Sequence, residues 1–155
     1  MDPGSFLQGR SRETAIHRDR TGRWFNDGVE ITHPGLVAAF DAWLKPAPDG
    51  SRRYCLSNDI NWAYVEIQGP PRFVRRVEVT EAGMLLTLSD GTRTPLDTDS
   101  LRQGPDGALY CDVPGDMTAC FDRHAQQSLD PLVEEDERGV FLRIGGRKVR
   151  PPTVP

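Results

Sequence analysis

The sequence predicts an α+β fold made mostly of antiparallel β hairpins, with two principal helices at about residues 33–45 and 117–129. Two observations predict it. Turns that contain glycine recur along the chain, each followed by a short strand with an aromatic residue, and Asp-Gly turns supply the positive φ that tight hairpins require. Helical spacing of apolar residues, in contrast, is confined to the two named segments. The turn–strand phrase is too short and irregular to be a repeat unit.

Length and composition bound the class of protein. The 155 residues allow a single domain over 21–150, or two small subdomains over 21–70 and 71–150. We expect residues 1–20 to form a flexible arm and the proline-rich residues 151–155 a disordered tail. The net charge of -4 does not favour nucleic acid or an anionic membrane. Because no signal peptide and no apolar run of roughly 18 residues is present, we expect a soluble cytoplasmic protein.

The first helix is the best defined and follows a small hairpin at 23–32. Thr32 is the predicted N-cap, and Pro34 falls in the first turn, where its missing N–H costs nothing. Pro46 ends the helix. Its predicted buried face consists of Leu36, Phe40, Trp43 and Leu44.

A run of strands is predicted between the helices. Residues 62–68 alternate, so that Ala63 and Val65 point to one face while Trp62 and Tyr64 point to the other. Pro95 cannot donate a ladder hydrogen bond and therefore indicates an edge strand or a strand end. The other predicted strands are residues 53–57, 73–80, 84–88, 93–96 and 108–113.

The second helix is predicted to begin after Asp116 as its N-cap. Its apolar face would hold Phe121, His124, Ala125 and Leu129. An acidic run at 134–137 then separates it from a closing hairpin over 140–150. The hairpin carries four basic residues, Arg143, Arg147, Lys148 and Arg150, which we expect to pair with the acidic run. The alternative is that the hairpin is an edge strand that binds a partner.

A family resemblance rests on hydrophobic and turn positions in this order: Trp24-Phe25, Gly28, Ile31, Leu36, Phe40, Leu44, Asp49-Gly50, Tyr54-Cys55-Leu56, Val65, Ile67, Pro71, Val74, Gly139-Val140-Phe141 and Gly145-Gly146. Over most of residues 20–150 the chain resembles the bacterial family called domain of unknown function twelve-eighty-five. That family pairs a WF-x-x-G-x-x-I hairpin with an amphipathic helix and a DG-x-Y-x-L strand. The chain departs from it at Ser57-Asn58, where the family often has Thr-Pro. The resemblance implies an α+β fold on antiparallel sheet and no activity, since none is established for the family.

The cysteines and histidines give little indication of a disulfide, a metal site or a catalytic site. Three cysteines, Cys55, Cys111 and Cys120, in a chain without an export signal indicate free thiols. No metal-ligand spacing occurs, so no metal and no cofactor is expected. Cys120 and His124, at i and i+4 of the second helix, are the one nucleophile and base pair, with Asp116 or Asp122 as the carboxylate. Packing of that helix is the alternative role of the pair.

The remaining candidate site combines aromatic and basic residues. Trp62 and Tyr64 share one face of a strand, and Arg72, Arg75 and Arg76 follow. Aromatic rings beside arginine stack bases or hold anionic ligands. The alternative is that both rings pack under the first helix while the arginines lie in water.

The favoured hypothesis is a non-catalytic binding module for a protein partner or a small anionic ligand. Phosphate-loop, dinucleotide and hydrolase motifs are absent from the sequence. An enzyme with a site around Cys120 and His124 is one alternative. A weak nucleic-acid binder is the other, and the acidic total charge disfavours it. The sequence leaves the oligomeric state open.

Overall fold

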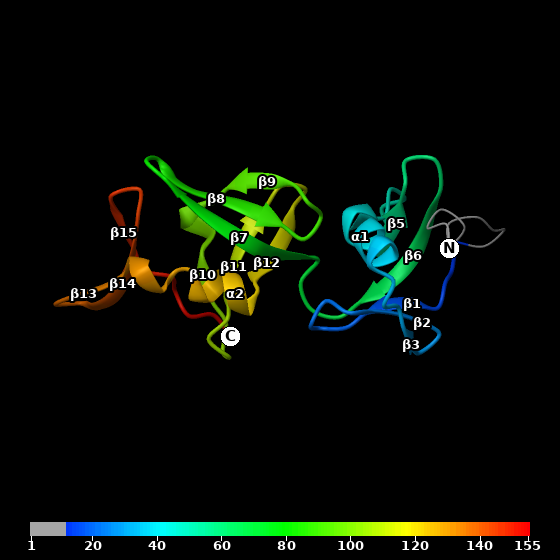
Figure 1. Cartoon of the computed structure of the whole chain (residues 1–155), viewed down its shortest axis with the longest axis horizontal. Helices are drawn as coiled ribbons and strands as arrows, with labels where there is room; N and C mark the ends of the chain where they lie inside the picture. Colours follow the sequence, from blue (N-terminus) through cyan, green and yellow to red (C-terminus); the bar gives the residue numbers. More distant parts are fainter. Residues whose placement is uncertain (1–11) are drawn as a thin grey trace. The chain divides into compact units, whose positions relative to one another are not determined.

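The computed structural model describes residues 12–155 and divides them into two compact units, one ending at Pro71 and the other beginning at Arg72 (Figure 1). Within that range each unit contains a six-stranded β-sheet and one α-helix, and the second unit also contains a three-stranded sheet. The sequence prediction of an α+β fold with mainly antiparallel pairing is confirmed.

The described part of the first unit holds a six-stranded sheet and the helix α1 (Pro34–Trp43). The strands are β1 (Ile16–Arg18), β2 (Trp24–Asn26), β3 (Val29–Glu30), β4 (Leu44–Pro46), β5 (Tyr54–Ser57) and β6 (Trp62–Ile67). Their order is β3-β2-β1-β6-β5-β4, and only the central pair β1–β6 is parallel in this sheet. Two three-stranded meanders, joined through α1, therefore meet along that central pair.

The helix α1 is capped one residue later than the sequence predicts. The N-cap is His33, whose Nδ1 accepts the backbone N–H of Leu36 at 3.2 Å, and not Thr32. The imidazole nitrogen of His33 accepts the hydrogen bond that a Ser, Thr, Asp or Asn oxygen accepts at most N-caps. Leu36 and Phe40 face the sheet as predicted, and the Phe40 ring meets the Trp24 ring edge-on at 5.4 Å. The predicted end at Pro46 is wrong: the helix ends at Trp43, and Leu44 is its C-cap and the first residue of β4.

The N-terminal arm predicted at 1–20 needs correction where the structure describes it. Residues 1–11 lie outside the described part of the chain. Ile16–Arg18, however, is strand β1 at the centre of the first sheet. Arg18 is buried, donates to the carbonyl of Pro70, and donates to that of Pro71 at 3.2 Å. The sequence did not indicate this strand, because one of its two buried residues is the charged Arg18.

The second unit contains another six-stranded sheet. Its strands are β7 (Arg72–Thr80), β8 (Gly83–Leu88), β9 (Arg93–Pro95), β10 (Arg102–Gln103), β11 (Leu109–Val113) and β12 (Met117–Phe121). Their order is β10-β11-β12-β7-β8-β9, with β12 and β7 parallel. The 3-10 turn η2 (Thr98–Ser100) joins the two meanders, as α1 does in the first unit. Both sheets therefore share one topology, and β9 lies at an edge, as Pro95 predicts.

The prediction of a helix over 117–129 is wrong in its first half. Met117–Phe121 is strand β12, with Met117, Ala119 and Phe121 buried in alternation. Gly115 and Asp116 both have positive φ, at 88° and 56°, so they form the turn of the β11–β12 hairpin. The helix α2 (Arg123–Gln127) starts only at Asp122, whose side chain accepts the N–H of Ala125 at 2.8 Å.

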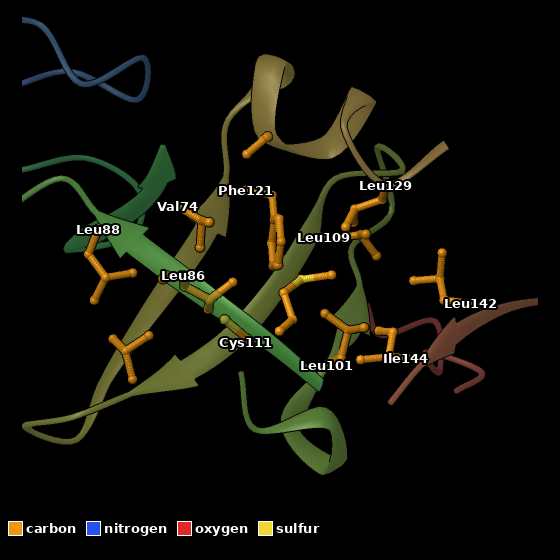
Figure 2. Packing of buried hydrophobic residues seen from close by; sticks show 14 of the residues in the cluster. Val74, Leu86, Leu88, Leu101, Leu109, Cys111, Phe121, Leu129, Leu142 and Ile144 are labelled. Carbon is orange, nitrogen blue, oxygen red and sulfur yellow. The ribbon is translucent and has the colours of Figure 1, made fainter. Parts of the chain in front are cut away.

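A three-stranded antiparallel sheet closes the second unit. It consists of β13 (Val133–Asp136), β14 (Gly139–Ile144) and β15 (Arg147–Val149), and follows the 3-10 turn η3 (Asp130–Leu132). One face of it joins the core of the unit, shown in Figure 2, through Leu142, Ile144 and Val149. The rest of this core comes from α2, from the buried faces of β7, β8, β11 and β12, and from Leu101 and Leu129 beside the 3-10 turns.

The C-terminal tail at 151–155 differs from the disordered segment that the sequence predicts. The N–H of Gln103 donates to the carbonyl of Pro152, and the N–H of Val154 donates to the carbonyl of Gln103, both at 2.8 Å. Thr153 forms a parallel bridge with Gln103. The tail thus satisfies backbone groups that the edge strand β10 would otherwise expose.

Candidate functional site

The five predicted ligand-binding residues belong to two different units. Trp62 and Tyr64 lie on β6 of the first unit, whereas Arg72, Arg75 and Arg76 lie on β7 of the second. Each group is therefore described with the residues of its own unit.

Trp62 and Tyr64 lie on the face of the first sheet opposite α1. Their neighbours Ala63 and Val65 are buried in the core that contains Leu36 of α1. Strand alternation turns the two half-buried aromatic rings to the other face, where they meet edge-on at 5.1 Å. The alternative that these rings pack under the first helix is therefore wrong.

Two arginines that the sequence did not single out cover these rings. The Cζ atom of Arg12 lies 3.8 Å from the ring centroid of Trp62, and that of Arg53 lies 3.7 Å from the ring centroid of Tyr64. Such stacking is a favourable cation–π geometry. Arg12 also donates to the carbonyl of Trp62 at 2.6 Å, which fixes its guanidinium over the ring.

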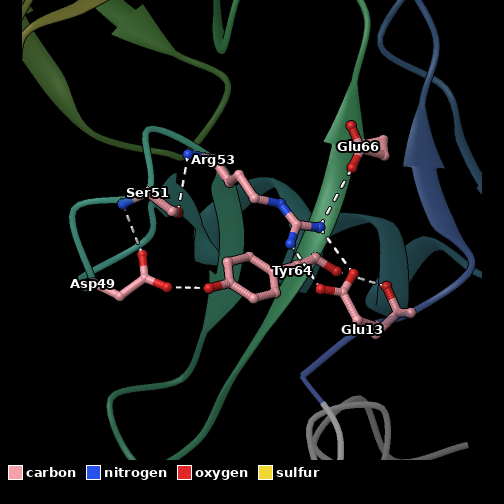
Figure 3. Close-up of polar contacts among 7 residues, drawn as sticks. Glu13, Asp49, Ser51, Arg53, Tyr64 and Glu66 are labelled. Atoms are coloured by element: carbon pink, nitrogen blue, oxygen red, sulfur yellow. Dashed lines mark hydrogen bonds and ion pairs between the residues drawn. The ribbon is translucent and has the colours of Figure 1, made fainter.

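Three carboxylates complete this group, and Figure 3 shows them around Arg53 and Tyr64. The whole group, which we call the aromatic–arginine cluster, consists of Arg12, Glu13, Asp49, Arg53, Trp62, Tyr64 and Glu66. Arg53 donates to both carboxylate oxygens of Glu13, at 2.7 and 2.9 Å, and lies 3.5 Å from Glu66. The Tyr64 hydroxyl donates to Asp49. That hydrogen bond, with others from Ser51, lowers the pKa of Asp49 to about 2, while it raises the pKa of Tyr64.

The charges of the cluster decide what it can hold. Two guanidiniums, of Arg12 and Arg53, stand against three carboxylates, of Glu13, Asp49 and Glu66. Arg53 is already engaged with Glu13, whose pKa it lowers. An anionic ligand would therefore meet net negative charge and a cation that is paired. The cluster orders this sheet face, and its charge balance disfavours an anionic ligand.

Arg72 is placed where a ligand cannot reach it, which corrects its assignment as a binding residue. It is 5% exposed and pairs in register with Ala119, on the core side of β7. Its Nε lies 3.5 Å from a carboxylate oxygen of Asp90, which is itself largely buried. A buried guanidinium requires such a partner, so the pair has a structural role.

Arg75 and Arg76 lie together on the outer face of the second sheet because β7 contains a β-bulge. Val74 pairs with Leu88 on the buried face, but Arg76, two residues on, pairs with Thr87 on the opposite face. The register shift leaves Arg75 as the extra residue. Two consecutive arginines therefore point to one side, which a regular strand forbids.

These arginines line a shallow hollow of about 710 Å³, which we call the arginine depression. Its other lining residues are Val77, Glu78, Thr87, Leu88, Ser89, Gly91 and Arg93. Arg93 pairs with Glu78 at 2.6 Å, and Arg75 lies 3.4 Å from Asp122. Arg76 is exposed and has no ion pair with any residue in 12–155. Three guanidiniums thus face a single lining carboxylate, in a chain that is negative overall.

Cys120 and His124 do not lie on one helix, as the proposed nucleophile and base pair requires. Cys120 lies on strand β12 and His124 on helix α2, so they do not share a helix face. The Sγ of Cys120 contacts the carbonyl of Phe121 at 3.4 Å. Burial raises the pKa of the Cys120 thiol, the opposite of what an activated nucleophile requires. Within residues 12–155, no group of three or more His, Cys, Asp or Glu side chains has the arrangement of a metal site.

Three of the four basic residues of the closing hairpin pair with the acidic run, as predicted, whereas Arg147 lies near Asp99 instead. Arg143 bonds Glu134 at 2.8 Å, Lys148 bonds Asp136 at 2.9 Å, and Arg150 also bonds Asp136. These contacts, Lys148 first, lower the pKa of Asp136 to about 2. The same three cations surround the Phe141 ring, with their charged groups 4.9 to 5.4 Å from its centroid.

Comparison with solved structures identifies the fold. A DUF1285 family protein from Silicibacter pomeroyi DSS-3 has a TM-score of 0.65 and 22% sequence identity, and the match covers 95% of this chain and 85% of that one. A second, from Shewanella baltica OS155, has a TM-score of 0.56 and 17% identity, over 76% of this chain and 91% of that one. No protein-family model and no curated protein sequence matches the chain. Among the described helices none is long and apolar enough to cross a membrane.

The chain thus has the fold of DUF1285 family proteins, and the resemblance to domain of unknown function twelve-eighty-five predicted from its sequence is confirmed at that level.

Proposed function

We propose that this protein is a non-catalytic binding module that holds a small multivalent anion in the arginine depression. The observation that carries the proposal is the β-bulge in β7, which turns Arg75 and Arg76 to the same side beside Arg93. Bulges commonly re-aim side chains at binding sites. Both residues were candidates on sequence grounds alone, and the bulge gives them a shared geometry.

The chemistry of the depression suits phosphate or carboxylate groups. Guanidinium forks donate pairs of hydrogen bonds to both anions, and charge-assisted bonds of this kind are about twice as strong as neutral ones. Arg76 has no competing ion pair in the described chain, and Thr87 and Ser89 add hydroxyl groups to the lining. Arg75 and Arg93 each hold one carboxylate at the rim, which an incoming dianion would displace or share.

The three thiols are consistent with action in the reducing cytoplasm, which we include in the proposal. Cys55, Cys111 and Cys120 are unpaired in the structure, and two of them are fully buried. Exported proteins more often carry paired cysteines.

Pyrophosphate is the probe for this function, followed by NMR of backbone amides and arginine Nε–H groups at constant ionic strength. We expect saturable shifts at Arg75, Arg76 and Arg93. Arg76→Gln should weaken binding about fivefold to tenfold, because it removes a charge-assisted hydrogen-bond donor.

Arg138→Gln is the matched control, since Arg138 is an exposed arginine in the β13–β14 turn whose side chain has no ion pair within residues 12–155. It should leave the affinity unchanged. Equal weakening by both variants, or shifts spread evenly over all exposed arginines, would show non-specific attraction and refute the proposal.

A further inference from the structure

A second hollow in the second unit differs from the arginine depression in both place and chemistry. It has a volume of about 360 Å³ and lies where three turns meet: β7 to β8, β9 to η2, and β14 to β15. We call it the three-turn pocket. Its lining residues are Thr80, Ala82, Gly83, Met84, Leu85, Pro95, Leu96, Thr98, Ile144 and Arg147.

The floor of this pocket is apolar and belongs to the core. Met84 and Ile144 are 4% and 3% exposed, and Leu96 packs against the same cluster. Apolar floors with few polar groups are typical of small-molecule sites. The apolar surface open to a ligand comes from the half-buried Leu85 and Leu96 and the exposed Pro95, and burying that surface under an apolar chain would be favourable.

The pocket depends on an unusually close approach of two turns. Gly145, with φ of 59°, lies so close to the β7–β8 turn that a Cβ atom there would be 2.7 Å from the carbonyl oxygen of Ala82. Glycine therefore lets the closing hairpin dock directly on the turn, with Ile144 and Arg147 on either side of the contact. The hollow is therefore bounded by two turns that lie in direct contact.

The charge of the lining selects the type of ligand. Arg147 is the single charged residue among the described lining residues. It has one ion pair in residues 12–155, with Asp99 at 3.9 Å, and the two side chains are 70% and 88% exposed. An ion pair that is so long and so exposed contributes little. The guanidinium can therefore pair with a ligand anion instead.

We propose that the three-turn pocket binds a medium-chain carboxylate, with its alkyl chain along Leu85, Pro95 and Leu96, next to the buried Met84 and Ile144, and its carboxylate at Arg147. At about 30 Å³ for each small group, the volume holds roughly twelve non-hydrogen atoms, the size of decanoate. A ligand of this size has an expected Kd of roughly millimolar. The site shares no lining residue with the arginine depression, so either proposal stands without the other.

The test compares two soluble probes with the same alkyl chain and opposite charge, decanoate and decyltrimethylammonium, below their micelle concentrations. Binding is followed by methyl NMR of Met84 and Ile144. We expect saturable shifts of both methyl groups and tighter binding of decanoate. Arg147→Gln should weaken decanoate about fivefold and remove the preference, and Arg147→Glu should reverse it.

Arg143→Gln provides the control within the same hairpin, because Arg143 lies on the other face, beside Phe141 and Glu134. It should leave decanoate binding unchanged. Equal affinity of the native chain for the two probes, equal weakening by Arg143→Gln and Arg147→Gln, or unsaturable methyl shifts would each overturn the proposal.

Discussion

Replacing Gly145 with alanine tests whether the hairpin contact holds the second unit together. A residue with a side chain at φ of 59° costs about 1 kcal/mol in backbone strain. Alanine would also place its Cβ atom 2.7 Å from the carbonyl oxygen of Ala82, 3.0 Å from its carbonyl carbon and 3.2 Å from Cα of Gly83. All three neighbours are backbone atoms, so the turns must separate. Overpacking of this kind costs about 1–3 kcal/mol, which gives a total of roughly 3 kcal/mol.

Gly146→Ala is the control that separates strain from crowding. Gly146 also has positive φ, at 76°, but a Cβ atom there would meet nothing within 4 Å. We expect it to destabilise the protein by only about 1 kcal/mol. Urea unfolding monitored through the methyl signals of Leu142 and Ile144 measures both variants, since the three tryptophans all lie before Pro71. If the two variants lowered the free energy of unfolding equally, the close approach at Gly145 would not contribute to the cost of the substitution, and the reasoning would be refuted.

Two further predictions concern titratable groups. Tyr64→Phe removes the hydroxyl that donates to Asp49, so the pKa of Asp49, about 2 in the native chain, should rise toward its ordinary 3.8 in a carboxyl ¹³C titration. Because the pKa of Asp49 is depressed in the folded state, its ionised carboxylate stabilises the native fold fully above about pH 4, and this stabilisation is lost as the pH falls toward 2. The variant should lose less stability over that range. An unchanged pKa of Asp49 in the variant would contradict the role given to the Tyr64 hydroxyl. Burial raises the pKa of Cys111 to about 12 and also raises those of Cys55 and Cys120, so iodoacetamide at pH 7 should label all three more slowly than a free thiol, with half-buried Cys120 first. Peptide mass mapping measures the rates, and a Cys120 faster than a free thiol would restore the nucleophile hypothesis.

The fold was predictable where one local pattern had one interpretation. The apolar spacing of α1 and the alternation of β6 determine helix and strand directly. Residues 117–121 were ambiguous, because Met117, Ala119 and Phe121 suit a strand, while Asp116 resembles a helix cap. The conformation of Gly115-Asp116 decides between them, and the residue types alone do not reveal that both have positive φ.

The partners of the aromatic rings were within reach of sequence reasoning. The predicted strands at 53–57 and 62–68 are joined by a short link, and the observed register pairs Ser57 with Trp62. Continuing that register places Arg53 opposite Glu66 and diagonal to Tyr64, where the structure has both contacts. Arg12 was not accessible in this way, because its position depends on the parallel pairing of β1 with β6, whose contacts span some fifty residues.

The shared topology of the two sheets shows which feature is particular to the candidate site. In each unit the first strand of the first meander runs parallel to the last strand of the second: β1 beside β6, and β7 beside β12. The connections differ, since α1 joins the meanders in one unit and η2 in the other. The pairing of β1 with β2 is regular, whereas that of β7 with β8 shifts between Val74 and Arg76. The bulge is thus a local departure from a scheme that folds without it, and it is the feature on which the proposed anion site depends.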